Sequence, residues 1–582
     1  MAMMISSLWQ FCFLSLALSY GVVELQASHH VHDNLQTTQL TSTQPQAKEP
    51  YRTGYHFQPP KNWINDPNGP LIYKGIYHLF YQYNPKGVVW GNIVWAHSTS
   101  TDLVNWIPHE AAIYPSQPFD INGCWSGSAT ILPGGKPAIL YTGINRQHQQ
   151  VQNLAFPKNL SDPFLSEWIK IPQNPLISPT LANQINATAF RDPTTAWLGP
   201  DKHWRLVIGS LRNQAGVAYL YRSKDFLYWV KAKHPLHSQK KAGMWECPDF
   251  FPVLKDSSTG VGVDTSTYGP HVKHVFKISL NDTRKEYYVI GTYNPSKDIY
   301  IPDEGSVESD SGLRYDYGKF YASKTFFDSA KNRRILWGWI NESSNPKSDI
   351  RKGWSGLQAI PRTIVLDKFG KQLVQWPVVE LEKLRTTEVK LPSIVLKGES
   401  LREVLGVTAA QADVEVAFEI SDFRKAEALD PSWINPQILC SKKGASVKGG
   451  LGPFGLFALA SKDLKENTAV FYRIFKSHNN YNKYVVLMCS DQSRSSLNQH
   501  NDKTTYGAFV NVDPLHEKLS LRSLIDHSIV ESFGGEGKAC ITARVYPTLA
   551  VDGDTHLYAF NYGSESVKIA GSVWSLKTAK IN

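Results

Sequence analysis

Three acidic residues in the first half of the chain stand in short motifs whose composition suits acid–base chemistry. Asp66 lies in the run WINDPNG, Asp192 lies in FRDP, and Glu246 lies in WECPD. An Asp beside Pro, Asn or Gly is often only a turn former, so no single motif establishes a catalytic role. Carboxylates in different surroundings within one cleft are how glycosidases separate a charged nucleophile from a protonated acid. Together, the three motifs therefore indicate a candidate glycoside-cleaving site.

The sequence neighbours of two of these carboxylates predict different protonation states. Arg191 directly precedes Asp192, and a guanidinium group favours the ionised form of a nearby carboxylate. Glu246 stands between an indole and a Cys-Pro pair, with Asp249 three residues further on. Apolar surroundings and a second carboxylate both favour the protonated form that a general acid requires. We therefore expect Asp192 to stay charged and Glu246 to donate a proton.

The elements that must position these motifs are short β-strands. Similar runs that end in small or turn residues recur at Tyr77–Gln82, Ile139–Gly143, Leu206–Ser210, Tyr288–Thr292 and Ile335–Trp339. A second element, Ser-x-Asp-x-x-x-Trp, occurs at Ser100–Trp106 and at Ser223–Trp229. Five units of about 65 residues, each with several strands, predict a five-bladed β-propeller over residues 51–380. The unequal steps between the runs leave an irregular sandwich as an alternative.

The pattern of the chain changes near residue 380. Residues 381–395 are charged and short of Gly, which predicts a linker. Beyond them, alternating runs such as Val414–Ile420 and Tyr484–Met488 predict strands with one buried face, and hence a β-sandwich over residues 396–582. Cys440 and Cys489 fall in this part and could pair across it. The expected fold class is all-β.

The N-terminal segment has the features of a secretory leader. Leu8–Leu18 is an apolar run shorter than the roughly 20 residues needed to span a bilayer, and small residues follow it. We expect residues 1–27 to be a signal peptide and the polar residues 28–50 to be a disordered leader or propeptide. No later apolar stretch is long enough for a membrane helix. Four glycosylation sequons agree with secretion, at Asn159, Asn186, Asn281 and Asn341.

Composition narrows the class of protein further. With 42% hydrophobic and 19% charged residues, a packed globular protein is expected, and 12% aromatic residues suit both β-sheets and sugar-binding surfaces. Six Cys residues are too few for a disulfide scaffold, and no Cys/His cluster has zinc-site spacing. The net charge of +10 comes without a basic run or a nucleic-acid motif. For a secreted protein this charge favours a polyanion such as pectin as partner, with a basic surface that has no partner as the alternative.

The three motifs, in this order, resemble glycoside hydrolase family 32, which contains the acid invertases and the fructan hydrolases. The resemblance covers residues 51–582 and implies a five-bladed propeller followed by a β-sandwich, in agreement with the repeat. It implies that Asp66 is the nucleophile, that Glu246 is the acid/base, and that Asp192 stabilises the transition state by binding fructose hydroxyls. The reaction would be a double displacement with retention, through a covalent fructosyl-enzyme. No metal or cofactor is implied.

The same resemblance implies the residues of the sugar pocket, which are Trp63, Asn65, Gln82, Trp90, Trp125, Ser126 and Arg191. It also implies that Asp282 and Lys285 hold the glucose end of sucrose, although Asn281 and Arg284 have the same spacing. Pro248 in WECPD resembles the cell-wall enzymes, whereas the vacuolar relatives usually carry Val there. Fructan exohydrolases share the Pro, so this position does not separate sucrose from fructan.

These features predict a secreted acid invertase of the cell wall or apoplast that hydrolyses sucrose. The expected partners are sucrose or other β-fructosides, cell-wall polyanions and a small proteinaceous inhibitor, with neither nucleic acid nor membrane. A fructan exohydrolase that acts on inulin or levan is the first alternative. A catalytically silent sugar-binding protein on the same scaffold is the second, and the presence of all three carboxylates argues against it.

Overall fold

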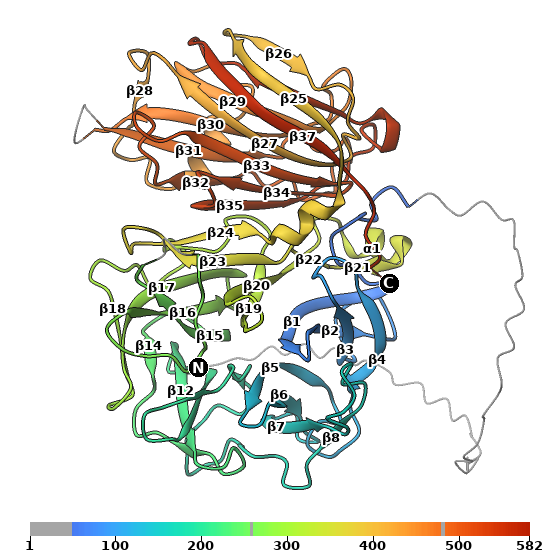
Figure 1. The fold of residues 1–582 in the computed structure, drawn as a ribbon, viewed down its shortest axis with the longest axis vertical. Helices are drawn as coiled ribbons and strands as arrows, with labels where there is room; N and C mark the ends of the chain where they lie inside the picture. The colour runs from blue at the N-terminus through green and yellow to red at the C-terminus, as the bar shows by residue number, and fades with distance from the viewer. Residues whose placement is uncertain (1–48, 257–259, 479–482, 582) are drawn as a thin grey trace, which may run out of the picture. The chain divides into compact units, whose positions relative to one another are not determined.

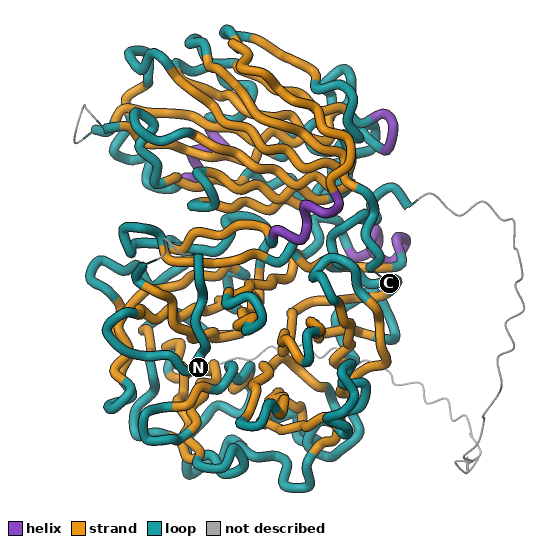
Figure 2. The backbone as a smooth tube through the Cα atoms, viewed as in Figure 1, coloured by secondary structure: helices purple, strands orange, loops and turns teal. Residues whose placement is uncertain are grey.

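The computed structural model describes residues 49–256, 260–478 and 483–581, and the regular secondary structure in this part of the chain is almost entirely β-strand (Figure 2). The predicted signal peptide and nearly all of the predicted leader lie outside the described residues. The helices within the described residues are short: α1 (Pro346–Lys352), α2 (Pro436–Lys442), and the 3-10 turns η1 (Val379–Leu384) and η2 (Asp552–Asp554). None of them has the length and apolar character needed to span a bilayer. The all-β expectation is confirmed.

Five sheets follow one another in the first part of the chain, and each is a blade of a β-propeller (Figure 1). The first contains β1 (Asn62–Tyr73), β2 (Ile76–Asn84), β3 (Val94–Ser100) and β4 (Ile107–Ile113). The second contains β5 (Cys124–Leu132), β6 (Lys136–Ile144), β7 (Gln150–Pro157) and β8 (Trp168–Lys170). The third contains β9 (Phe190–Arg191), β10 (Trp197–Leu198), β11 (Trp204–Arg212), β12 (Ala215–Ser223), β13 (Val230–Lys231) and β14 (His237–Gln239).

The fourth sheet contains β15 (Trp245–Leu254), β16 (Val272–Leu280), β17 (Lys285–Asn294) and β18 (Ile299–Pro302). The fifth contains β19 (Tyr321–Asp328), β20 (Arg333–Ile340), β22 (Leu357–Gln358), β23 (Arg362–Leu366) and β24 (Leu373–Pro377). The ring of blades closes on β1, which lies against β5 on one side and β19 on the other. The later segment β21 (Trp354–Ser355) also pairs in parallel with the start of β1.

The sequence repeat marks equivalent strands in four of the five sheets. Four of its runs lie on β2, β6, β11 and β20. In the first, second and fifth sheets this strand directly follows the first strand, and in the third sheet it follows the two short strands β9 and β10. The run Tyr288–Thr292 lies instead on β17, one strand further along its sheet. This shift lengthens one step of the repeat and shortens the next, which explains the unequal spacing. The number of sheets in this part of the chain equals the number of predicted units.

Two packed sheets follow the propeller and form the β-sandwich. One contains β25 (Arg385–Leu396), β37 (Val567–Leu576), β27 (Gln411–Ile420), β33 (Leu519–Asp526), β34 (Ile529–Gly534) and β35 (Ala539–Arg544). The other contains β26 (Ser400–Glu403), β36 (His556–Asn561), β29 (Leu451–Ala460), β30 (Thr468–Lys476), β31 (Tyr484–Asp491) and β32 (Tyr506–Val510), with β28 (Glu427–Ala428) beside β30. Side chains from both sheets, such as Val414 and Leu456, share one buried core.

The structure corrects the expected linker at residues 381–395. Most of this segment is β25, an edge strand of the sandwich that pairs with β37 along its length. Glu388 and Lys390 are exposed because an edge strand with one solvated face tolerates charged side chains and is protected by them against further pairing. The same charges gave the segment its linker-like composition. The sandwich therefore begins at Arg385.

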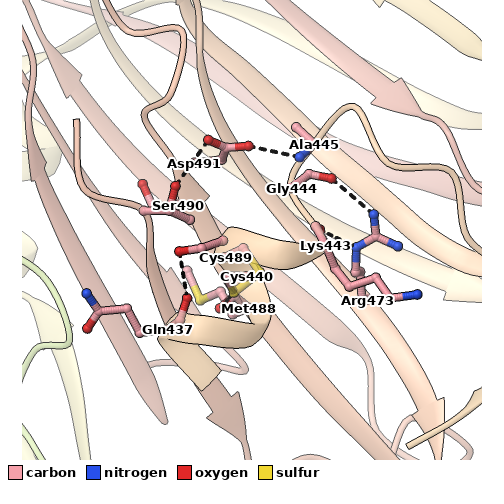
Figure 3. The surroundings of a disulfide bond; sticks show 12 residues. Gln437, Cys440, Lys443, Gly444, Ala445, Arg473, Met488, Cys489, Ser490 and Asp491 are labelled. Atoms are coloured by element: carbon pink, nitrogen blue, oxygen red, sulfur yellow. Dashed lines mark hydrogen bonds between the residues drawn. A yellow bond between two sulfur atoms is a disulfide. The ribbon is translucent and has the colours of Figure 1, made fainter. Parts of the chain in front are cut away.

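A disulfide anchors helix α2 to the sandwich (Figure 3). The pairing of Cys440 with Cys489, which the sequence left as a possibility, is present. Around it, the backbone N–H of Ala445 donates to Asp491 at 2.9 Å, and Arg473 donates to the carbonyl of Lys443 at 2.7 Å. The three other cysteines of the described residues are unpaired and buried.

Buried charges join the propeller to the sandwich. The His56 ring lies between two sandwich carboxylates, with Nδ1 2.8 Å from Asp526 and Nε2 3.0 Å from Glu531. Arg362 of β23 donates to Glu531 at 2.7 Å. Burial by itself lowers the pKa of His56, but the two carboxylates outweigh it, so the pKa is raised. The interface therefore includes a histidine that favours its charged form.

Candidate active site

The first strands of all five propeller sheets contribute to one cavity of about 610 Å³. Asp66 comes from β1, Ser126 from β5, Arg191 from β9, Glu246 from β15 and Tyr321 from β19. Asp192, directly after β9, also lines it, so the cavity contains all three carboxylates of the sequence motifs. Residues that are far apart in the sequence meet here because each blade presents its first strand to the same space.

These first strands are irregular where they reach the cavity. The pairing register shifts between Ile64 and Pro67, Trp125 and Gly127, Glu246 and Asp249, and Tyr321 and Lys324. A bulge of this kind bends the strand and redirects the side chains within it. The backbone also takes positive φ values at Asp192, Cys247 and Ala322, of 66°, 44° and 52°. Such values are uncommon for residues other than glycine and cluster at functional sites.

The Asp66 carboxylate is held by two donors from the same cavity. The hydroxyl of Ser126 donates to Oδ2 at 2.6 Å, and the side-chain amide of Asn65 donates to Oδ1 at 2.9 Å. The indole of Trp63 in turn donates to Asn65 at 2.8 Å, which fixes the amide. Burial raises the pKa of Asp66 above its ordinary value, and the hydrogen bonds from Ser126 and Asn65 offset only part of this rise. The group is therefore positioned by donors that favour its ionised form.

Asp192 is nearly fully buried, at 3% exposed. The backbone N–H of Cys247 donates to its Oδ2 at 2.8 Å, and Asp192 itself donates its backbone N–H to Thr142 at 2.9 Å. Burial raises the pKa of Asp192 to about 6, although the charge of Arg191 lowers it. Arg191 lowers the pKa of Asp192, as expected. Burial has the larger effect, however, so the net pKa is raised and the carboxylate is less readily ionised than expected.

The surroundings predicted for Glu246 are wrong. Instead of apolar neighbours, it has Arg191 2.7 Å from Oε1, Arg284 3.3 Å from Oε2, and the Tyr321 hydroxyl 2.5 Å from Oε2. Asp249 does not share this site, because its carboxylate accepts the backbone N–H of Thr325 in the next blade. Successive strand residues point to opposite faces, so Arg191 meets Glu246 rather than its neighbour Asp192.

All seven residues expected to form the sugar pocket line the cavity: Trp63, Asn65, Gln82, Trp90, Trp125, Ser126 and Arg191. Trp90 is 54% exposed and stands edge-to-face against Trp125, with ring centroids 5.6 Å apart. Gln82 is buried and donates to the carbonyl of Cys124 at 3.2 Å. The cavity thus has an aromatic rim at its opening and polar groups at its base.

Of the two residues expected to hold the glucose end of sucrose, Lys285 lines the cavity and Asp282 does not. Lys285 lines the cavity, but its ammonium group lies 3.0 Å from Asp310. Asp282 lies on the tight turn between β16 and β17, is exposed, and does not line the cavity. Asp282 and Lys285 are three residues apart, but the turn directs their side chains differently, and the sequence spacing does not reveal this. The turn presents Arg284 to Glu246 instead.

The four sequons occupy two kinds of place. Asn159 and Asn186 are exposed, and each accepts a backbone N–H from its own turn. Asn281 and Asn341 line the cavity, so a glycan on either would crowd its opening. Glycosylation at all four positions stays a prediction.

Sequence reasoning missed the cavity residues that come from the fifth blade and from the sandwich. Tyr321, Phe320 and Trp339 line the cavity from the fifth sheet, and Gln437 and Tyr506 do so from the sandwich. No charged motif marks these residues. The repeat could have located the fifth-sheet group, because a first strand must precede the run Ile335–Trp339. Within the described residues, no group of three or more His, Cys, Asp or Glu side chains is arranged to hold a metal ion.

Comparisons with known proteins agree with this architecture. Residues 56–377 match the model of the N-terminal domain of glycosyl hydrolases family 32, and residues 380–575 match the model of its C-terminal domain. An insoluble isoenzyme of β-fructofuranosidase from Arabidopsis thaliana is 64% identical over 99% of this chain and 99% of its own length. A cell wall isozyme of β-fructofuranosidase from Pisum sativum is 62% identical over 94% of this chain and 98% of its own length.

A solved structure is similar along nearly its whole length. The crystal structure of fructan 1-exohydrolase IIa from Cichorium intybus has a TM-score of 0.89 and 53% identity, and the match covers 92% of this chain and 99% of that one. A fructan 6-exohydrolase from Beta vulgaris is 63% identical over 92% of this chain and 88% of its own length. Relatives named β-fructofuranosidase, at 64% and 62% identity, and relatives named fructan exohydrolase, at 63% and 53%, are therefore both similar to this chain in sequence.

Proposed function

We propose that this chain, which belongs to glycosyl hydrolase family 32, hydrolyses sucrose to glucose and fructose with retention of configuration. It is a β-fructofuranosidase, and the proposal concerns the residues that carry the reaction. The observation that supports it most is the convergence of Asp66, Asp192 and Glu246 from three different blades in one cavity, each with a different set of hydrogen-bond donors. Different surroundings let three similar carboxyl groups take different roles.

In the first step, a carboxylate oxygen of Asp66 attacks the anomeric carbon of the fructosyl unit. Ser126 and Asn65 hold this carboxylate in place and favour its charged form. Glu246 donates a proton to the glycosidic oxygen, so glucose leaves as a neutral alcohol. Arg191 and Tyr321 fix the orientation of the Glu246 carboxyl group toward that oxygen. The product of this step is a covalent fructosyl-enzyme.

In the second step, Glu246 takes a proton from a water molecule, and this water attacks the fructosyl carbon. The bond to Asp66 breaks, fructose leaves with its original configuration, and Glu246 is protonated again. Asp192 binds hydroxyls of the fructosyl ring and stabilises the positive charge of the transition state. Its buried position beside the Cys247 N–H keeps it out of bulk water, where such interactions are weaker.

The variant Asp66→Asn tests the nucleophile. The charge-matched control is Asp422→Asn, which changes an acidic residue of the sandwich that pairs with Arg424. The amide cannot form the covalent intermediate, so initial sucrose hydrolysis should fall by several orders of magnitude in the first variant. The control should keep its rate. A folded Asp66→Asn protein with near-normal turnover would refute the assignment.

Stereochemistry provides an independent test. Proton NMR of the first turnover products should show fructose released in the β configuration, because two displacements at the anomeric carbon restore it. Release of α-fructose would indicate a single displacement by water and would overturn the retaining mechanism.

The relatives include proteins named as β-fructofuranosidases and proteins named as fructan exohydrolases, so the preference for sucrose over fructan has to be measured separately. Named β-fructofuranosidases support sucrose, whereas the similarity to fructan exohydrolases and the position of Asp282 outside the cavity favour the alternative. Side-by-side kcat/KM values on sucrose, inulin and levan distinguish them. We expect sucrose to be highest, and a higher value on inulin or levan would assign the chain to the exohydrolases. A folded protein inactive on all three would support the silent binding protein.

We also propose that the chain acts outside the cell, in the wall. The names of its relatives include the words insoluble and cell wall, and the apolar run near the N-terminus has the length of a signal segment. The basic net charge favours acidic wall polymers as partners. A small inhibitory protein that covers the cavity opening is a further proposed partner. Fractionation of tagged protein between wall and soluble extract tests the location.

A further inference from the structure

A second cavity lies at the outer edge of the third and fourth blades. Its volume is about 660 Å³, and its lining shares no residue with the catalytic cavity. It is lined by the segments from the end of β12 through β13 to His234, by residues 296–298 between β17 and β18, and by His203. Figure 1 shows β18 at the left-hand edge of the propeller, whereas β1, which carries Asp66, lies near its middle. A ligand bound here would leave the catalytic cavity open.

The lining of this outer groove is strongly basic. It contains five Arg or Lys side chains, two histidines and two carboxylates: Arg222, Lys224, Lys231, Lys233, Lys297, His203, His234, Asp225 and Asp298. The excess of positive groups within one concave surface concentrates an attractive potential for anions.

Both carboxylates of the groove accept hydrogen bonds from the protein itself. Asp225 accepts the backbone N–H groups of Leu227 and Tyr228 at 2.9 and 2.8 Å. Asp298 is buried and accepts from Arg205 and from the hydroxyl of Tyr293. Asp298 also lies 3.5 Å from Arg222, which pairs with Asp201 as well, so the charge of Arg222 is compensated. The exposed Asp225 reduces the positive charge of the four lysines but does not balance it.

Three of the lysines have no internal partner. Within the residues that the structure describes, Lys224, Lys233 and Lys297 form no ion pair, and all three are exposed. Holding several free ammonium groups around one groove costs electrostatic repulsion, which a bound polyanion relieves. A single small anion would compensate only part of this charge, so the groove favours a ligand with repeated negative groups.

Apolar surface lies beside these charges. Tyr228 is 81% exposed and Val230 is 65% exposed, and both line the groove. A flat aromatic ring next to ammonium groups suits a sugar ring that carries a carboxylate, because the ring packs on the aromatic face while the carboxylate meets the lysine.

We propose that this outer groove binds an acidic polysaccharide built of uronate sugars and so holds the enzyme on the wall. The groove combines repeated positive charge with an exposed aromatic ring, which a polymer of carboxylated sugars complements on both counts. Relatives named insoluble and cell wall isoenzymes agree with a ligand that belongs to an insoluble matrix. The proposal rests on the wall location proposed above but not on the hydrolytic reaction.

The test measures binding of the whole mature protein to polygalacturonate, with fully methyl-esterified pectin as the uncharged probe. The groove variant is the triple change Lys224→Ala, Lys233→Ala and Lys297→Ala. Its charge-matched control changes three exposed lysines of the sandwich, Lys390→Ala, Lys462→Ala and Lys568→Ala. The groove variant should raise Kd for polygalacturonate about ten-fold or more, and the control less than about three-fold. Tyr228→Ala should also weaken binding, with the salt dependence of Kd unchanged.

Two results would overturn the proposal. Equal losses in the two triple variants would show that net charge, and not the groove, determines binding. Equal affinity of the unmodified protein for polygalacturonate and for the methyl-esterified polymer would show that carboxylates are not recognised. Sucrose turnover is measured on the same samples and should be unchanged in every variant. Absence of sucrose turnover in the unmodified protein would refute the proposed hydrolase while the binding comparison stands by itself.

Discussion

The hydroxyl of Ser126 provides a test of the proposed nucleophile that leaves the nucleophile itself intact. This hydroxyl donates to Asp66 Oδ2 at 2.6 Å, and Asn65 donates to the other oxygen. Burial raises the pKa of Asp66, and the hydrogen bond from Ser126 is the largest of the interactions that lower it. Ser126→Ala should therefore make protonation of Asp66 easier while removing only one oxygen atom.

The size of the effect follows from the chemistry of the bond. A hydrogen bond to a charged group contributes about 1.5–3 kcal/mol, and about 1.4 kcal/mol corresponds to a ten-fold change in an equilibrium. Protonation of Asp66 should then be favoured roughly ten- to a hundred-fold in the variant. Only the ionised carboxylate attacks, so kcat/KM should fall by about that factor on the acid side of the pH profile. At higher pH, where Asp66 is ionised in both proteins, the difference should be much smaller.

The assay is initial sucrose hydrolysis measured from about pH 3 to about pH 7 in buffers of constant ionic strength. Ser128→Ala is the matched control, since Ser128 lies on the same strand, is buried, and has a hydroxyl without a hydrogen-bond partner among the described residues. Its profile should follow that of the unmodified protein. A Ser126→Ala profile lowered by the same factor at every pH would mean that Ser126 contacts substrate only. An unchanged profile would refute the role of Ser126 and weaken the assignment of Asp66.

Three further outcomes follow from other contacts. Tyr321→Phe removes the hydroxyl 2.5 Å from Glu246 and should lower kcat about ten-fold with KM changed less than about three-fold, because the acid/base loses its orientation; an unaltered kcat would contradict this. Replacing Cys440 and Cys489 together by Ser should cost about 2–4 kcal/mol of stability, measured as a lower Tm, with kcat on sucrose within about two-fold of normal. The raised pKa of His56 means that its protonated form stabilises the fold below about pH 6.5 and that this stability is lost as pH rises through the raised value. Tm should accordingly fall less between about pH 6 and pH 9 in His56→Gln than in the unmodified protein, and equal slopes would refute the charged histidine.

Much of the architecture could be predicted from the sequence because the blades repeat. Each blade contains a strand whose run of apolar and small residues is local, so the pattern survives even though the blades differ in length. The three carboxylates were also accessible to sequence reasoning, because each motif is contiguous and forms or directly follows a first strand. The disulfide was accessible for a different reason, since Cys440 and Cys489 fall in the same predicted domain.

The directions of the side chains could not be predicted in the same way. Arg191 precedes Asp192, but the strand turns it toward Glu246, and the bulge after Glu246 turns Asp249 toward the next blade. A bulge shifts the alternation of faces by one residue and has no reliable sequence signature. Asp282 lies outside the cavity lining for a related reason, because it stands on the tight turn between β16 and β17, where spacing does not determine direction. Charged composition suggested a linker where an exposed edge strand stands.

The donors that distinguish the carboxylates come mostly from neighbouring blades. Asp66 of the first blade takes its shortest hydrogen bond from Ser126 of the second. Glu246 of the fourth blade takes one from Tyr321 of the fifth and one from Arg191 of the third. A motif therefore supplies a carboxyl group, whereas contacts between blades determine its protonation and orientation.

This division explains why the motifs are necessary for the chemistry but do not by themselves specify it. Asp192 and its N–H donor Cys247 also lie in different motifs, and both residues have positive φ values at the point where their blades meet. The two strained residues keep the carboxylate against the N–H, and rigid packing of the blades is what maintains that strain. A substitution that loosens one blade boundary should therefore impair the carboxylate at that boundary first, even though all three acidic residues remain in place. Loss of activity without loss of any motif is the expected signature of such a change, and it would arise from the packing between blades rather than from the motifs.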